Sequence, residues 1–122
     1  MRILGFNKKW DKLKNDTFTT FRFERRDADW QLGETVQVVY KPRTRGREVL
    51  GIAKIVSKEP RFVPQNDWVL RPRCAQQATN SEAIADGFTS IFTMVAWLNK
   101  TYGRERLIDE PMNKLTLQWE DE

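Results

Sequence analysis

The sequence predicts a small α+β domain, a compact β-barrel with two to three short helices, that occupies residues 1–122 as a single unit. Three observations lead to this prediction. The chain has 122 residues, which is the size of one domain. Alternating apolar and polar residues, typical of strands, dominate the first half and return near the C-terminal end. The main helix signals lie between these regions, so we expect the last strand to return and close the sheet.

The first three predicted elements lie before residue 26. Arg2–Phe6 is predicted to form a short strand, and Lys8–Leu13 a short helical stretch with Trp10 and Leu13 on one face. Thr17–Arg25 is the clearest strand, because Thr and Phe favour pleated structure. Alternation places two sets of side chains on opposite faces. The predicted core face holds Thr17, Thr19, Phe21 and Phe23, and the face predicted to line a site holds Phe18, Thr20, Arg22 and Glu24.

The middle of the chain predicts a long hairpin with a basic tip. A turn at Leu32–Glu34 precedes a strand at Thr35–Tyr40, and Glu48–Lys58 forms the second strand. The connecting loop, Lys41–Arg47, contains Pro42 and Gly46 as turn signals. The segment from 60 to 73 is interrupted by three prolines, so we expect at most short edge strands there.

Two helices and a last strand complete the prediction. Thr79 and Glu82 have the spacing of a capping box, and Gly87 ends this short helix. Thr89 or Ser90 caps the next helix, which ends at Gly103. Its apolar residues recur at helical spacing, at Ile91, Val95, Leu98 and Tyr102. Lys114–Trp119 alternates as the closing strand.

Basic residues are concentrated in the front of the chain. Residues 1–73 contain 17 Lys and Arg against 9 Asp and Glu, whereas residues 74–122 contain 4 against 8. Such an uneven charge favours an anionic partner for one face, with nucleic acid as the first candidate. The alternative is a solvated basic face, which many small domains have.

Missing residue types exclude several kinds of chemistry. The chain has no histidine and one cysteine, Cys74, which excludes Ser-His-Asp and Cys-His triads, internal disulfides and Cys-cluster metal sites. No apolar stretch approaches the roughly 20 residues that span a bilayer. The N-terminus also lacks the apolar segment of a signal peptide. We therefore expect a cytoplasmic monomer with no membrane contact, no metal and no cofactor.

Four segments, taken in order, resemble the ASCH domain, a branch of the PUA-like barrels. Each is short, and their order and spacing carry the resemblance, which covers about residues 4–120. The segments are Thr17-Phe18-Thr19-Thr20-Phe21-Arg22, Leu32-Gly33-Glu34-Thr35-Val36, Glu82-Ala83-Ile84-Ala85-Asp86-Gly87-Phe88, and the run from Met94 through Trp97-Leu98 to Tyr102-Gly103.

This resemblance implies a PUA-like barrel with a cleft beside the first segment, and RNA or modified nucleosides as ligands. Some members are amidohydrolases that act on acetylated cytidine with a Lys, a Thr and a Glu, and others have been described as ribonucleases. The Thr corresponds to Thr20 and the Glu to Asp86, whereas Thr17 occupies the Lys position. Lys14 is the tentative substitute for that Lys, and whether the chain is an enzyme stays open.

Each candidate residue also has a structural interpretation. Thr20 and Arg22 either face a ligand or serve as a sheet residue and an ion-pair partner of a carboxylate. Asp86, at a helix C-terminus where a negative charge is unfavourable, either contacts a ligand or is solvated. The basic loop either grips phosphates or is a solvated tip. The predicted nucleic-acid contacts are Arg22, Arg25, Arg26, Lys41, Arg43, Arg45, Arg47 and Lys54.

The aromatic residues divide into two groups. Trp30 and Trp68 lie in polar or proline-interrupted segments, where they either stack on a base or pack under a loop. The predicted core aromatics are Phe21, Phe23, Trp97 and Trp119.

Three functions follow as hypotheses. The first is an RNA- or nucleotide-binding module with Thr20 and Arg22 at the floor of a basic cleft and the basic loop at its rim. The second is a hydrolase that acts on RNA or an acetylated nucleoside, centred on Thr20 and Asp86. The third is a protein-interaction adaptor whose basic face binds an acidic partner.

Overall fold

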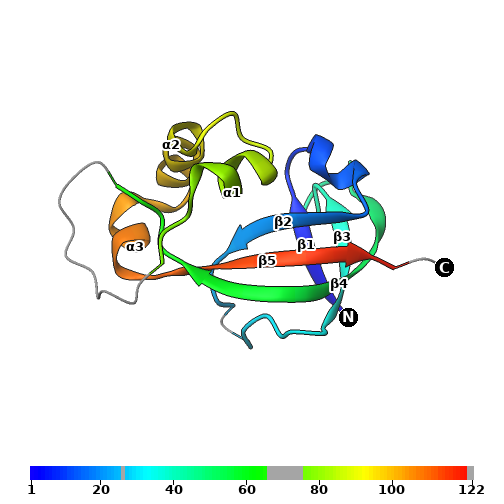
Figure 1. The fold of residues 1–122 in the computed structure, drawn as a ribbon. Coiled ribbons are helices and arrows are strands. Elements are labelled where there is room, and N and C mark those ends of the chain that lie inside the picture. The colour runs from blue at the N-terminus through cyan, green and yellow to red at the C-terminus, as the bar shows by residue number, and fades with distance from the viewer. Residues whose placement is uncertain (26, 66–75, 121–122) are drawn as a thin grey trace.

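The computed structural model describes residues 1–25, 27–65 and 76–120 (Figure 1). Within these ranges the chain folds as an α+β domain with five strands and three α-helices, which confirms the α+β class and the short helices of the prediction but not its barrel. The elements in chain order are β1 (Arg2–Phe6), the 3₁₀ helix η1 (Asp11–Lys14), β2 (Thr17–Arg22), β3 (Thr35–Tyr40), β4 (Glu48–Arg61), α1 (Asn80–Ala85), α2 (Ile91–Tyr102), α3 (Arg104–Asp109) and β5 (Met112–Trp119).

The strands form one mixed sheet in the order β1-β3-β4-β5-β2. β1 runs parallel to β3, and every other neighbouring pair is antiparallel. The predicted hairpin of β3 and β4 is present, with Tyr40 opposite Glu48. β5 returns to the sheet as expected but pairs with β4 and β2, which leaves β1 and β2 as the two edges.

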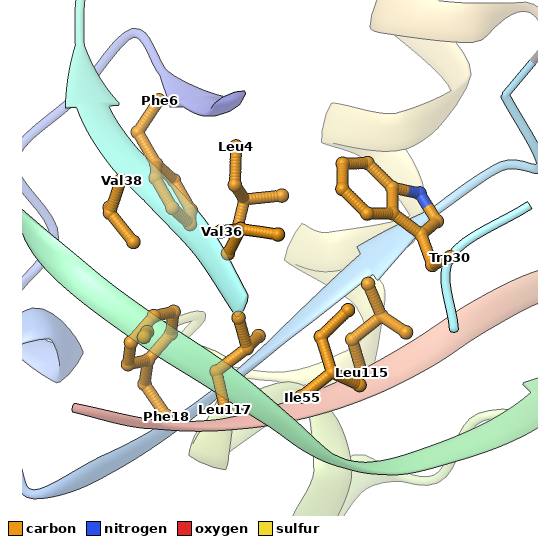
Figure 2. Packing of buried hydrophobic residues seen from close by; sticks show 10 residues of the cluster. Leu4, Phe6, Phe18, Trp30, Val36, Val38, Ile55, Leu115 and Leu117 are labelled. Carbon is orange, nitrogen blue, oxygen red and sulfur yellow. The ribbon is translucent and has the colours of Figure 1, made fainter. Parts of the chain in front are cut away.

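All five strands contribute side chains to a single apolar cluster, so the sheet curls around it (Figure 2). Because the two edge strands share this core, they lie on either side of an opening that we call the seam. The closed barrel expected from the sequence is therefore not formed, since side chains rather than strand pairing connect β1 to β2. The cluster comprises Leu4, Phe6, Phe18, Trp30, Val36, Val38, Ala53, Ile55, Leu115 and Leu117.

A second apolar cluster joins β2 to the helices, which gather at one end of the sheet (Figure 1). Phe21 and Phe23 pack there with Met94 and Leu98 of α2. β2 is consequently covered on both faces, whereas the sequence predicts one core face and one site face. The predicted division is wrong for one residue on each face. Phe18, predicted to face the site, is buried in the first cluster, and Thr17, predicted to face the core, is exposed.

Glu82 anchors α1 to the sheet. It forms the predicted capping box with Thr79 at the helix N-terminus. Its Oε2 also lies 3.1 Å from Nε of Arg61 and 2.7 Å from Nζ of Lys114, at the ends of β4 and β5. The position of α1 in turn fixes Asp86, the residue that caps its C-terminus.

Three elements differ from their predicted form. β4 continues through Pro60, beyond the residues that pair with β3, and there it pairs only with β5. Proline has no backbone N–H, and on the unpaired side of the strand none is needed. The stretch Lys8–Leu13 holds only the 3₁₀ turn η1, and α3 follows Gly103 without a sequence pattern that marks it. In the described ranges, no helix has the length and apolar character required to cross a membrane.

Candidate ligand pocket at the seam

A pocket of about 230 Å³ lies where the two edge strands face each other, and α2 forms its third side. We call it the seam pocket. β1 contributes Gly5 and Phe6, and β2 contributes Thr20, Phe21 and Arg22. The remaining lining residues come from the segment after β1, from the end of α1 and from α2: Asn7, Lys8, Trp10, Lys12, Asp86, Phe88, Met94, Trp97, Leu98, Thr101 and Tyr102.

A buried ion pair lies in this lining. Lys12 Nζ is 3.2 Å from Oδ1 of Asp86, and the two side chains are 4% and 8% exposed. Thr19 donates a hydrogen bond of 3.1 Å to the same carboxylate oxygen. Burial lowers the pKa of Lys12, against the raising effect of Asp86. Burial likewise raises the pKa of Asp86, against the lowering effects of Lys12 and Thr19.

Arg22 connects the two edge strands across the seam. Its Nε donates to Oγ1 of Thr20 at 3.0 Å, and its Nη2 donates to the carbonyl oxygen of Gly5 in β1 at 2.7 Å. The guanidinium also lies 4.7 Å from the centroid of the Phe6 ring. Thr20 is buried, so this hydroxyl and guanidinium form a fixed polar group within the lining.

Three aromatic rings form one wall of the pocket. Trp10 contacts Phe88 at a centroid distance of 5.1 Å and Trp97 at 6.2 Å. Trp97 is predicted as a core residue, but 45% of it is exposed. The reason is its place on α2, where Met94 and Leu98 face the second cluster and Trp97 borders the pocket. An exposed aromatic of this kind can stack on a planar ligand.

Gly87 allows this wall to form. Its φ is +110°, in the left-handed region that favours glycine, and a Cβ there would lie 2.9 Å from Cε3 of Trp10. The chain can therefore turn sharply after Asp86 and bring the Trp10 ring against its backbone. The same turn carries the carboxylate and the aromatic wall to adjacent parts of the pocket.

A second hollow of about 650 Å³, which we call the loop hollow, adjoins the first. The two share Gly5, Asn7, Arg22 and Tyr102 as lining residues, so Arg22 borders both. The base of the basic loop reaches this hollow through Pro42, Arg43 and Thr44. The other lining residues are Ile3, Phe23, Arg25 and Trp30.

The structure brings three predicted site residues together and leaves one apart. Thr20, Arg22 and Asp86 all line the seam pocket. Lys14 does not: its side chain is 83% exposed and lies 3.6 Å from Asp11. Lys12 occupies the pocket instead. No pattern in the sequence distinguishes it from Lys8, Lys9 and Lys14, and lysine is rarely buried.

The predicted nucleic-acid contacts separate into three groups. Arg22, Arg25 and Arg43 line the loop hollow. Lys41, Arg45 and Arg47 are exposed on the loop but line neither hollow, and Lys54 is exposed between buried Ala53 and Ile55, on the outer face of β4. Arg26 lies outside the described residues, as do Trp68 and Cys74.

The seam pocket can bind a planar, polar group. Its aromatic wall offers stacking, and the rest of the lining offers an ammonium, a guanidinium, a hydroxyl and a carboxylate. Its volume is below the range of roughly 300–1,000 Å³ that holds drug-sized ligands, which favours a group the size of one base. No cluster of three metal-ligating side chains occurs within the described ranges. Comparisons with protein-family models, curated proteins and solved structures give no match to this chain.

Proposed function

We propose that this protein binds a nucleotide-like ligand, a nucleotide of RNA or a modified nucleoside, with its base in the seam pocket. The observation that carries the proposal is the pairing of an aromatic wall with a polar lining in one small pocket. Proteins that bind unpaired bases use the same combination, stacking the base on an aromatic ring and hydrogen-bonding its edge.

The position of the motif residues supports an ASCH-type assignment. Thr20 and Arg22 come from the first segment that resembles this domain, and Asp86 comes from the third. Residues so far apart in the chain line one pocket, as the family's cleft implies. We therefore propose an ASCH-type module whose sheet stays open at the seam.

Trp97 allows a direct test, because it borders the pocket and is partly exposed. Calorimetric titration with short single-stranded RNA, cytidine and acetylated cytidine should detect binding of at least one of them to the full chain. Trp97→Leu should weaken that binding about fivefold or more, since stacking contributes roughly 1–3 kcal/mol per base. The matched control is Phe92→Leu, on the same helix, 74% exposed and outside the seam pocket. Absence of binding, or equal effects of the two variants, would refute the proposal.

A hydrolase is the second candidate, and one observation favours it. Lys12, Thr20 and Asp86 line the same pocket, so Lys12 can supply the amine that the resemblance expects at position 17. Burial lowers the pKa of Lys12, which favours a neutral amine able to accept a proton. In this scheme Lys12 accepts the proton of Thr20 Oγ1 as that oxygen bonds to an amide carbonyl carbon. The C–N bond then breaks while Lys12 passes the proton to the leaving nitrogen, and water hydrolyses the ester to release the acid and restore the Thr20 hydroxyl.

Product analysis separates this candidate from simple binding. Acetylated cytidine or RNA incubated with the protein should be converted if the hydrolase hypothesis is correct, and Thr20→Val should abolish the conversion. Thr17→Val is the matched control, because Thr17 is exposed on the same strand and does not line the pocket. If the compounds bind but remain intact, the binding function stands and hydrolysis of these compounds is rejected.

A further inference from the structure

The loop hollow has a charge pattern unlike that of the seam pocket. Its charged lining residues are three arginines, and no acidic residue lines it in the described part of the chain. In the seam pocket, by contrast, Asp86 offsets Lys12. A hollow whose charged lining residues are all cationic, beside a site for a polar ring, is suited to an anionic group.

Two of these arginines differ in how firmly they are held. Arg25 lies 5.3 Å from the Trp30 ring and donates to the Ile3 carbonyl at 3.4 Å, so its side chain is oriented along β1. Its Nε is 3.4 Å from Oδ1 of Asp27, an exposed carboxylate that solvent screens. Arg43 is exposed and forms no ion pair with any residue of the described ranges, so its donors are available to a ligand.

The backbone holds the base of the basic loop against β1. Lys41 N donates to the carbonyl oxygen of Phe6 at 2.8 Å. Pro42 packs on Gly5 so closely that a Cβ at position 5 would lie 2.7 Å from its Cγ. The start of the loop, which follows β3, is therefore held beside Gly5, a residue that lines both hollows. Arg43 is the first residue of the loop beyond this anchor.

We propose that the loop hollow is a phosphate subsite, in which Arg25 and Arg43 bind the phosphate of a nucleotide whose base occupies the seam pocket. The proposal rests on the proposed nucleotide-binding function and narrows the ligand to phosphorylated forms. Arg22 borders both hollows, so the sugar crosses beside it. Guanidinium groups match the geometry of phosphate oxygens with paired donors, whereas a free nucleoside leaves the second hollow unused.

The test compares nucleosides with their monophosphates on the full chain. Calorimetry at low salt with the four common nucleosides, their 3′- and 5′-monophosphates and inorganic phosphate measures each part of the ligand separately. At least one monophosphate should bind about tenfold or more tightly than its nucleoside. Arg43→Gln should remove most of this difference and leave nucleoside binding unchanged. Inorganic phosphate should bind weakly to the wild type and more weakly to the variant.

Arg47→Gln is the matched control, because Arg47 is on the same loop and lines neither hollow. It should leave both affinities within about twofold of the wild type. Equal losses in the two variants would mean that loop charge alone attracts the ligand, and would overturn the subsite. Nucleosides and monophosphates that bind equally would also overturn it while the proposed function stands. No binding of either class, nor of single-stranded RNA or acetylated cytidine, would refute the proposed function itself.

Discussion

Lys12 and Asp86 place a buried ion pair in the lining of the seam pocket. An ion pair with both side chains more than nine-tenths buried loses most of its hydration, and an apolar pair of similar volume is often as stable or more stable. The pair therefore adds little stability to the fold, and we propose that its charges serve a ligand or a reaction in the pocket. Thr19 donates a second hydrogen bond to the same carboxylate oxygen without lining the pocket.

Lys12→Met should destabilise the protein by about 3 kcal/mol at neutral to alkaline pH, because it leaves the Asp86 carboxylate buried without its cation. Burial holds the pKa of Asp86 above its ordinary value of 3.8. A group with a raised folded-state pKa favours the fold at low pH and loses this effect as pH rises through that pKa. The lowered pKa of Lys12 also makes the penalty larger at high pH. The wild type loses stability as pH falls through that pKa, whereas the variant has no lysine there and does not. The penalty should therefore grow with pH.

Urea unfolding at several pH values between about 4 and 8 measures this penalty. Lys14→Met is the matched control and should change little, since Lys14 is exposed. Adding Asp86→Asn to Lys12→Met should recover most of the loss at high pH. A penalty that stays constant across the pH range would contradict the pair described here.

At the residue scale, the sequence predicts those site residues that belong to regular patterns. Alternation along β2 places Thr20 and Arg22 on one face, and the capping box followed by Gly87 places Asp86 at a helix end. Lys12 is not predictable in this way, because burial of a lysine depends on a carboxylate 74 positions later in the chain. The prediction that Trp97 belongs to the core is wrong for a related reason. Helical spacing identifies residues that share a face of α2 but does not show which part of the fold packs against that face.

Among the elements, the link from α1 to α2 does the most to shape the pocket. The chain turns at Gly87 and places its backbone against Trp10, while Ser90 caps α2 with Thr93 in a second capping box. Both caps and the closing Gly103 follow from local sequence. β4 and α3 show the limit of such rules, since Pro60 is tolerated only because β3 has already ended.

Gly87→Ala should lower the free energy of unfolding by about 1–3 kcal/mol and displace the Trp10 ring, because it combines a strained φ with a close contact. Gly33→Ala is the matched control: its φ is +86°, but nothing lies within 4 Å of the added Cβ. The difference between the two variants measures the contact with Trp10. Chemical unfolding gives the energies, and near-ultraviolet circular dichroism reports the aromatic wall. Equal energies and an unchanged spectrum for Gly87→Ala would contradict the packing described.

At the scale of the molecule, the predicted nucleic-acid contacts within the described residues do not share one surface. The loop that carries Arg43 and Arg45 opens beside the two hollows, whereas Lys54 lies on the outer face of β4. The charge count of the sequence cannot separate these surfaces, because neighbouring strand residues point to opposite sides of a sheet. The order of the predicted strands along the sequence likewise does not show whether the sheet closes into a barrel. Closure depends on the pairing of β1, which runs parallel to β3 and does not pair with β2.

Binding of single-stranded RNA should weaken as salt increases, and the slope should report which surface is used. Arg45→Gln should reduce the slope of log affinity against log salt by about 0.7 if Arg45 neutralises one phosphate. Lys54→Gln, which removes the same charge from the outer face, should leave the slope unchanged. Fluorescence titration across a salt series provides both values. Similar reductions in the two variants would indicate binding spread over the whole basic surface.

The hydrogen bond from the Arg22 side chain to the Gly5 carbonyl joins β1 to β2, the two strands whose backbone hydrogen bonds would close the sheet into a barrel. A ligand in contact with both edge strands would therefore hold β1 and β2 together. Because it binds only when the two edges are in place, it raises the melting temperature in proportion to the logarithm of its concentration above the dissociation constant. It also slows amide exchange in β1 and β2 before it does so elsewhere. A screen of melting temperatures can therefore identify the proposed ligand, because compounds that contact both edge strands stabilise the folded sheet.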